Sequence, residues 1–320
     1  MVMAEVVTET LAEDGPVDFL APPATFPLLE RMGRVTDAIR MPLGHGQLGL
    51  GVRRRLGIAL REKGYARAIV LPNTFKSALV PWFARIPVRT GWIGEQRRIV
   101  LNDARRLDRQ ALPRMVDRYR ALVTEAGEAS GTAGADRAGG QAPRLQSDAE
   151  NGARLRAAMG LADPAIALCP GAEFGPAKQW PATHFHELAL RCVQAGYEVW
   201  LLGAERDDDL CAGMAANPMI KNLAGRTTLP DAVDLLAEAE VAVTNDSGLM
   251  HVAAAVGTRV VAVYGSTTPE FTPPLSPDAV VVQDELPCRP CFERTCPLGH
   301  TRCLTELSVD RVFEAMGIAK

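Results

Sequence analysis

Short runs of β-branched and other apolar residues alternate with longer amphipathic segments along most of the chain. This alternation is typical of parallel sheets whose strands are connected by helices. We therefore predict an α/β protein. The expected strands are 17–21, 68–71, 165–169, 198–202, 241–244 and 260–264, and the expected helices of the first half are 1–13 and 49–63.

The chain is too long for a single ordinary core, so two domains are expected from its 320 residues. Residues 125–150 are rich in Gly, Ala and Ser and have no periodicity. Such a segment has little to bury, which makes it a candidate linker. We predict an N-terminal domain over residues 1–150, with the linker from about 125, and a C-terminal domain over residues 151–320.

Composition and charge exclude several classes of protein. A hydrophobic content of 47% with 23% charged residues is not that of a mainly disordered chain. The net charge of -3 predicts no nucleic-acid partner, so a phosphate-bearing ligand must be held by local positive sites. We find neither a membrane-spanning apolar run nor a signal peptide, and expect a cytoplasmic protein.

The segment Thr244–His251 is the strongest local motif. A strand end is followed by Asp246, Ser247 and Gly248, and then by a helix. The free N–H groups and the dipole of a helix start favour an anion, most simply a diphosphate. The alternative is an Asp or Ser helix cap without a ligand.

The loop Cys169–Pro181 also follows a strand and carries one lysine, Lys178. A Gly- and Pro-rich loop at this position suits a phosphate-binding cleft, and the lysine could neutralise a leaving diphosphate. The alternative is a solvated surface lysine. The loop is not a Walker A motif, because Gly-x4-Gly-Lys-Ser/Thr is absent.

A run of acidic residues, Glu205–Asp209, follows the next predicted strand. An acidic side chain at this position could accept hydrogen bonds from a ribose. The run also matches a metal-binding Asp-x-Asp pattern. Acidic residues in the first turn of a helix also favour its dipole, and that simpler explanation covers at least two of them.

In the first half, Pro72–Ser77 follows a predicted strand, and four arginines come soon after it. Such a cluster of cations could bind an anionic acceptor substrate. Solvated arginines are the alternative for any one of them. The four are Arg85, Arg89, Arg97 and Arg98.

Four cysteines form a C-x2-C-x4-C-x6-C pattern near the C-terminus: Cys288, Cys291, Cys296 and Cys303. In a cytosolic protein they could hold a structural zinc ion, whose tetrahedral shell suits sulfur ligands. Reduced cysteines without a metal are the alternative. Four thiolates would leave no open position for catalysis.

Together these segments resemble the heptosyltransferases of glycosyltransferase family 9. The resemblance covers nearly the whole chain apart from the linker. It is carried by residues 71–81, 89–92, 169–178 with Trp180 and Pro181, 244–251, 264–265 and 271–276.

The resemblance implies a GT-B fold, in which two Rossmann-like domains face a cleft. It also implies transfer of L-glycero-D-manno-heptose from ADP-heptose to the first heptose of the lipopolysaccharide inner core, with inversion at the anomeric carbon. The reaction would need no cofactor besides this donor. The enzyme would work in a Gram-negative bacterium, at the inner face of the inner membrane, and touch that membrane transiently.

The resemblance also assigns residues. Lys178 would stabilise the departing ADP, and Glu205 is a close alternative to Asp207 at the ribose. The donor would be bound by Lys178, Asp207, Thr227, Asp246, Ser247, Gly248 and Leu249, and the acceptor by Asn73, Lys76 and Arg89.

The family opens with a β-strand and a Gly-Asp loop, followed by a helix similar to the one expected at Met1. That first strand and the candidate general base are therefore expected upstream of Met1. Two explanations remain, a start codon assigned too late and a truncated, weakened product. The alternative functions are a sister transferase with another acceptor, and a catalytically impaired protein that binds nucleotide or core sugar.

Overall fold

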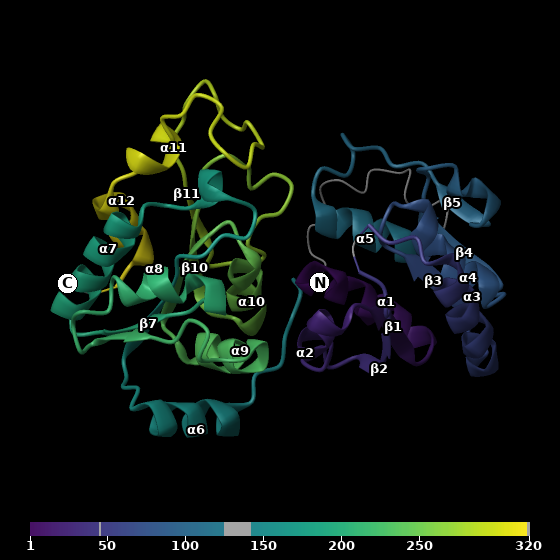
Figure 1. The fold of residues 1–320 in the computed structure, drawn as a ribbon, viewed down its shortest axis with the longest axis horizontal. Helices are drawn as coiled ribbons and strands as arrows, with labels where there is room; N and C mark the ends of the chain where they lie inside the picture. The colour runs from purple at the N-terminus through teal and green to yellow at the C-terminus, as the bar shows by residue number, and fades with distance from the viewer. Residues whose placement is uncertain (45, 125–141, 319–320) are drawn as a thin grey trace. The chain divides into compact units, whose positions relative to one another are not determined.

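The computed structural model describes residues 1–44, 46–124 and 142–318. The chain divides into two compact units, which consist mainly of Met3–Gln141 (unit 1) and Ala142–Lys320 (unit 2). Each is an α/β unit with parallel strands, as predicted. Figure 1 shows unit 1 in purple to blue and unit 2 in teal to yellow.

Unit 2 is built on one six-stranded sheet with the order β11-β10-β9-β6-β7-β8, in which all neighbours are parallel. Its strands are β6 (Ala165–Cys169), β7 (Glu198–Leu201), β8 (Ile220–Asn222), β9 (Val241–Asn245), β10 (Arg259–Val263) and β11 (Val280–Val282). Its helices are α6 (Ala149–Met159), α7 (Ala182–Gln194), α8 (Asp208–Ala212), α9 (Leu229–Glu238), α10 (Gly248–Val256), α11 (Arg302–Thr305) and α12 (Val309–Met316).

The central strands of this sheet are buried along their whole length, because helices cover both faces. Every residue of β6, β7 and β9 is buried. The helix α12 packs against α7, while α9 packs against α6 and α10 (Figure 1). Near-continuous apolar runs such as 165–169 are what a parallel sheet covered on both faces requires.

Unit 1 contains two smaller parallel sheets, β1-β2 and β3-β4-β5. Their strands are β1 (Val17–Ala21), β2 (Val35–Arg40), β3 (Arg67–Val70), β4 (Val88–Trp92) and β5 (Asp103–Arg105). The helices are α1 (Val6–Asp14), α2 (Phe26–Leu29), α3 (Leu50–Ala59), α4 (Leu79–Phe83) and α5 (Met115–Val123), and short 3-10 turns include η4 (Phe75–Ala78) and η5 (Arg97–Ile99).

Within the described residues, β1 and β3 each pair with a neighbour on one side only. Side chains connect the two sheets: the Tyr65 hydroxyl donates to Asp18 Oδ2 over 2.5 Å, and Lys63 pairs with Asp37 at 3.3 Å. Burial, and then the hydrogen bond to Asp18, raise the pKa of Tyr65 above its usual range. The neutral phenol therefore holds the bond at all physiological pH values.

The boundary between the units lies nine residues before the predicted one, at 141 in place of 150. Residues 142–150 belong to unit 2, where the Leu145 N–H donates to Ala255 O at 3.0 Å and the Asp148 N–H donates to Asp234 Oδ1 at 2.7 Å. Asp148 then caps α6. Most of the predicted linker, residues 125–141, lies outside the described residues.

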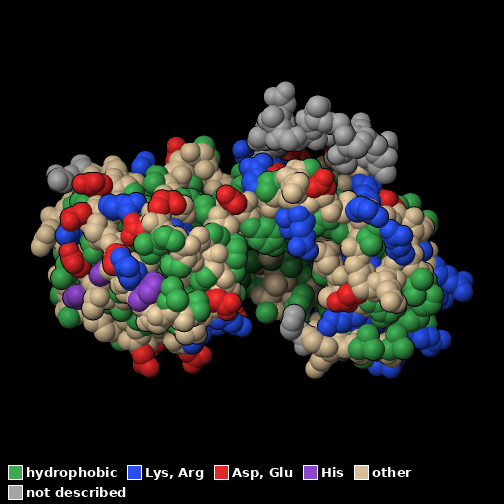
Figure 2. All heavy atoms as spheres, turned by 90° about the horizontal axis from the view of Figure 1, so that it is seen from above, with side chains coloured by type: hydrophobic (Ala, Val, Ile, Leu, Met, Phe, Trp, Pro, Cys, Tyr) green, Lys and Arg blue, Asp and Glu red, His purple; other side chains and the backbone are tan. Residues whose placement is uncertain are grey.

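The two units carry opposite charge. Residues 1–124 contain 20 Lys and Arg against 12 Asp and Glu, whereas residues 142–320 contain 14 against 23. In the face shown in Figure 2, basic side chains predominate on unit 1, and acidic ones are more numerous on unit 2. The small net charge of the whole chain therefore conceals a basic unit, which can attract anionic partners.

Candidate active site

The loops after β6 to β10 share one edge of the unit 2 sheet, because the strands are parallel. From β6 the chain continues to β7 and β8 on one side, whereas β9 and β10 lie on the other. The strand order thus reverses between β6 and β9. Ligands of open α/β sheets bind at the carboxyl ends of the strands beside such a reversal. The loops on either side of it carry Lys178 and Asp246.

Lys178 and Asp246 form a largely buried ion pair. The distance from Lys178 Nζ to Asp246 Oδ2 is 2.5 Å, and the side chains are 13% and 6% exposed. The Thr267 hydroxyl donates to the same carboxylate oxygen over 2.7 Å. Lys178 Nζ also lies 4.8 Å from the centre of the Phe174 ring. The lysine is therefore held in place, which the alternative of a solvated surface lysine does not explain.

The start of α10 lies directly after Asp246 and is open. Ser247 is the N-cap residue, yet its side chain accepts no hydrogen bond from the described part of the helix. Gly248 is exposed, and a Cβ placed on it would meet no described atom within 4 Å. First-turn N–H groups lack partners within a helix, so those at Ser247, Gly248 and Leu249 can face an anion. The uncapped geometry favours the anion-site prediction over the simple cap.

Asn245 joins the two loops of this site. Its side chain is fully buried, its Nδ2 donates to Pro170 O at 2.7 Å, and its Oδ1 accepts from the Trp180 N–H at 3.0 Å. The Trp180 indole in turn donates to Leu307 O at 3.0 Å. These bonds fix the loop after β6 against the end of β9, and so fix the position of Lys178.

Two carboxylates of the acidic loop after β7 have different surroundings: one is buried and the other is exposed. Asp207 is buried, and its Oδ2 accepts from the Ala204 N–H at 3.0 Å. It packs so closely on Gly171 that a Cβ there would lie 2.5 Å from its carboxylate. Glu205 is exposed and lies beside Gly225 of the next loop. Asp207 therefore shapes the loop, while Glu205 is the carboxylate that faces solvent.

Thr227 belongs to the loop after β8, one strand further along the same edge. Its side chain is half-buried, and its hydroxyl donates to Leu223 O at 3.4 Å. The next residue, Thr228, caps α9 together with Asp231. The edge thus presents, in order, the α10 start, Lys178, Glu205 and Thr227.

In unit 1, Asn73 and Lys76 follow β3 in a loop that Arg97 holds. The Arg97 side chain is fully buried, its Nε donates to Trp92 O at 2.6 Å, and its Nη1 donates to Pro72 O. Burial lowers the pKa of this guanidinium. Asn73 is exposed and Lys76 is half-buried. One buried cation therefore shapes the loop that presents both predicted acceptor residues.

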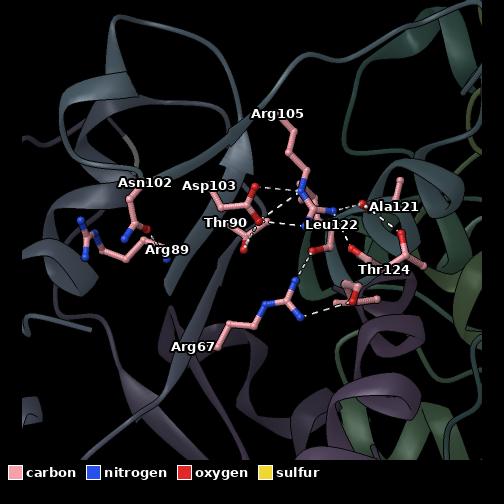
Figure 3. A network of polar contacts seen from close by, with 10 residues as sticks. Arg67, Arg89, Thr90, Asn102, Asp103, Arg105, Ala121, Leu122 and Thr124 are labelled. Atoms are coloured by element: carbon pink, nitrogen blue, oxygen red, sulfur yellow. Dashed lines mark hydrogen bonds and ion pairs between the residues drawn. The ribbon is translucent and has the colours of Figure 1, made fainter. Parts of the chain in front are cut away.

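Arg89 does not join them. It lies near the start of β4, paired in register with Ala68, whereas Asn73 and Lys76 come after the end of β3. Its Nε donates to Val100 O at 2.7 Å, and its backbone N–H donates to Asn102 Oδ1 at 2.8 Å (Figure 3). The geometry gives Arg89 a structural role and does not support its predicted acceptor role.

A second polar network holds β4 and β5 against α5 (Figure 3). Arg105 pairs with Asp103 at 2.8 Å and donates to Ala121 O at 2.7 Å, and the Thr90 hydroxyl donates to Asp103 Oδ2 at 2.9 Å. Burial alone would raise the pKa of Asp103, but the hydrogen bonds from Arg105 and Thr90 lower it overall. Asp103 is therefore a structural carboxylate.

The four predicted zinc ligands are free thiols that line one cavity with His300. Among the described residues, however, no three His, Cys, Asp or Glu side chains are already gathered as a metal-binding group. The structure thus shows a cluster of thiols and no finished coordination shell.

Comparison with known proteins supplies the family. The family model for glycosyltransferase family 9 (heptosyltransferase) matches residues 53–302. Lipopolysaccharide heptosyltransferase 2 of Salmonella typhimurium strain LT2 is 44% identical to this chain over an alignment of 333 positions. The alignment covers 99% of this chain and 94% of that protein. The chain belongs to glycosyltransferase family 9.

Solved structures agree with this family. The structure of E. coli ADP-heptose lps heptosyltransferase II matches with a TM-score of 0.86 and 41% identity, over 99% of this chain and 94% of that one. E. coli heptosyltransferase WaaC with ADP matches with a TM-score of 0.71 over 99% and 95% of the two chains, and at 19% identity it shows the fold alone. This member of the family is therefore a glycosyltransferase with the α/β fold of these structures.

Three residues of this glycosyltransferase that shape its site were not singled out as such from the sequence. Asn245 lies inside the Thr244–His251 motif, but the sequence assigned it no role of its own. Thr267 lies in none of the motifs. Arg97 is one of four arginines that the sequence does not distinguish from one another. Their roles depend on contacts between segments that are distant in sequence. For Asn245, the position directly after the predicted buried strand 241–244 was a usable signal, since a buried amide needs partners.

Proposed function

We propose that this family 9 enzyme moves L-glycero-D-manno-heptose from ADP-heptose to the first heptose of the lipopolysaccharide inner core, with inversion. The high identity to heptosyltransferase 2 along almost the whole chain supports this acceptor. The observation that carries the chemistry is the buried Lys178–Asp246 pair beside the open start of α10.

The donor would lie along the carboxyl edge of the unit 2 sheet. Its diphosphate faces the N–H groups at Ser247, Gly248 and Leu249 and the ammonium of Lys178. Its ribose then lies over the loop after β7, where the exposed Glu205 is a better hydrogen-bond acceptor than the buried Asp207. The adenine extends toward Thr227. The name of the 41% identical solved relative, E. coli ADP-heptose lps heptosyltransferase II, supports this donor.

The reaction would be driven by stabilisation of the leaving ADP. The bond from the anomeric carbon to the diphosphate oxygen breaks, and its electron pair leaves with ADP. The acceptor hydroxyl oxygen forms the new bond from the opposite face and gives its proton to a base, for which we assign no residue. Lys178 and the α10 dipole act on the charge that develops on ADP. Asp246 positions the lysine through their ion pair.

We assign the acceptor to the loop after β3, with Asn73 and Lys76 as its polar contacts. The inner core is anionic, and the excess of Lys and Arg in unit 1 complements it. Arg97 holds this loop through its hydrogen bonds, so it is a residue that positions Asn73 and Lys76. Arg89 is left out because of its structural contacts.

We also propose a GT-B arrangement in which a further parallel strand pairs between β1 and β3. The open edges of these two strands support it, since an unpaired edge is a site for strand addition. The resemblance places the Gly-Asp loop and the general base after that strand.

We propose that the enzyme contacts the inner face of the inner membrane through α3 and α4. None of the described helices has the length and apolar character needed to cross a bilayer. Leu50, Arg54 and Ile58 recur every four residues on one exposed face of α3. Leu50 is 52%, Ile58 37% and Trp82 of α4 43% exposed. Gly57 lets α3 approach α4 closely, because a Cβ there would lie 2.6 Å from Val80 O. Exposed apolar groups beside arginines suit an anionic bilayer surface.

Vesicle sedimentation tests this face. Vesicles with phosphatidylglycerol should bind the enzyme, whereas phosphatidylcholine vesicles should bind it weakly. Replacement of both Arg54 and Trp82 by Ser should abolish the difference. If the variant binds phosphatidylglycerol vesicles as well as the wild-type enzyme does, another surface contacts the membrane.

A transfer assay tests the function. ADP-heptose and a heptose-I-terminated core acceptor are incubated with the enzyme, and the product is measured by mass. We expect the enzyme to add one heptose to this acceptor. Transfer of another sugar, or only to an acceptor without heptose I, would reject the proposed reaction.

A further inference from the structure

The cysteine loop of unit 2 lies against the Lys178 loop. The Arg294 Nε donates to Phe174 O at 2.6 Å, and the Ala177 N–H donates to Arg294 O at 3.1 Å. Gly175 allows this approach, since a Cβ there would lie 2.5 Å from Arg294 O and its φ is +147°. The Cys288–Cys303 segment thus supports the loop that carries Lys178.

The four thiols of this segment surround one small cavity. Cys288, Cys291, Cys296 and Cys303 all line it, and its volume is about 20 Å³. This is room for one water-sized occupant.

A further feature suits an occupant bound by thiolates. Ser266 also lines the cavity and is only 1% exposed, yet its hydroxyl has no hydrogen-bond partner among the described residues. A buried hydroxyl without a partner is costly, and a metal-bound thiolate would accept its hydrogen bond.

We propose that Cys288, Cys291, Cys296 and Cys303 bind one structural Zn²⁺ ion. A shell of four thiolates suits zinc and leaves no open position for substrate. Because no three ligands are yet gathered in the described structure, binding would draw the four sulfur atoms inward around the cavity. The ion would fasten the cysteine loop and thereby hold the Lys178 loop, a coupling that rests on the proposed function.

Metal analysis of the purified full chain tests the site. The protein is prepared without a chelator, passed through gel filtration, and analysed for zinc and iron by plasma mass spectrometry. We expect about one zinc per chain. Cys291→Ser and Cys296→Ser should each lose most of it, whereas Cys192→Ala, which alters a buried cysteine of α7 outside the cluster, should retain it.

Cobalt keeps the proposal testable if the serine variants do not fold. Zinc is removed from the wild-type chain and Co²⁺ is added, with far-ultraviolet circular dichroism as the check on folding. The site predicts intense thiolate-to-cobalt charge-transfer absorption that saturates at one equivalent. Absence of this absorption, zinc far below one per chain, iron in place of zinc, or a Cys288–Cys291 disulfide would each overturn the proposal.

The coupling to the donor loop has its own readout. Removal of zinc should weaken ADP binding, measured by calorimetry, several-fold without unfolding the chain. Unchanged ADP affinity in the zinc-free chain would reject the coupling. Metal content does not depend on transfer, so failure of the zinc site and failure of the proposed transferase reaction remain distinguishable.

Discussion

The two units of this glycosyltransferase build their sites in different ways. In unit 2 the candidate donor groups follow strands that are buried along their length in one six-stranded sheet. In unit 1 the candidate acceptor groups lie in the loop after β3 of a three-stranded sheet, where one buried arginine replaces the support of a large core. The candidate donor groups are thus placed by the sheet, and the candidate acceptor groups by a single polar side chain.

The largest expected effect is at Lys178. Lys178→Ala should lower the rate of heptose transfer about 10²- to 10³-fold, because it removes a fixed charge beside the leaving group. Steady-state kinetics with ADP-heptose measures this loss. Lys221→Ala is the matched control, since Lys221 also pairs with a buried carboxylate of unit 2, Glu198, at 3.8 Å. Equal rates for both variants would remove Lys178 from the mechanism.

Arg97 tests the dependence of unit 1 on one side chain. Arg97→Ala should destabilise unit 1 by about 3 kcal/mol, since buried carbonyls at Trp92 and Pro72 lose a charged donor. Hydrogen exchange should rise in β3 to β5 while β6 to β10 stay protected. An equal rise of the exchange rate in both units would show that Arg97 does not stabilise unit 1 specifically.

Asn245 provides the corresponding test in unit 2. Asn245→Ala should cost about 2 kcal/mol, because Pro170 O and the Trp180 N–H lose their buried partner. The sheet itself should persist, and the KM for ADP-heptose should rise in addition to this loss of stability, because the Lys178 loop is no longer fixed. A large fall in unfolding temperature with unchanged KM would contradict a loop-positioning role.

The smallest effect concerns acid stability of unit 1. Because the folded pKa of Asp103 is lowered, its contribution is present above the unfolded-state value of about 3.9 and is lost as the pH falls through the folded value. Asp103→Asn should remove about 1 kcal/mol of stability at pH 7 and less at pH 2. Denaturant titrations at both pH values measure this difference. An equal loss of stability at both would show that the charge of Asp103 is not its source.

The sequence predicts unit 2 better than unit 1, for a physical reason. Strand 165–169 was predicted with the observed bounds, because all of its residues are apolar and buried. Strand 17–21 of unit 1 was also predicted with the observed bounds, although Asp18 interrupts its apolar run. Strand β4 contains Arg89, Thr90 and Gly91, and β2 has three exposed residues, so neither shows an apolar run. Their strand character comes from pairing with neighbours, which composition does not show.

The same distinction holds for the site. Lys178 and the Asp246–Leu249 segment were predicted because a helix start and a loop after a strand have local signatures, and their donor role stays a prediction. The structural contacts of Arg89 and Asp207 were missed, since they depend on Val100 and Gly171, which are distant in sequence. Local motifs therefore suggest a candidate donor edge, whereas the fold shows which of the candidate residues make structural contacts.

Hydrogen exchange with and without ADP tests the location of the donor site most directly. The account predicts slower exchange in the loops after β6, β7, β8 and β9, around residues 171–179, 203–207, 223–228 and 246–250. The loop of Asn73 and Lys76 should be unchanged. Protection by ADP in that unit 1 loop, with none at the unit 2 edge, would contradict the account.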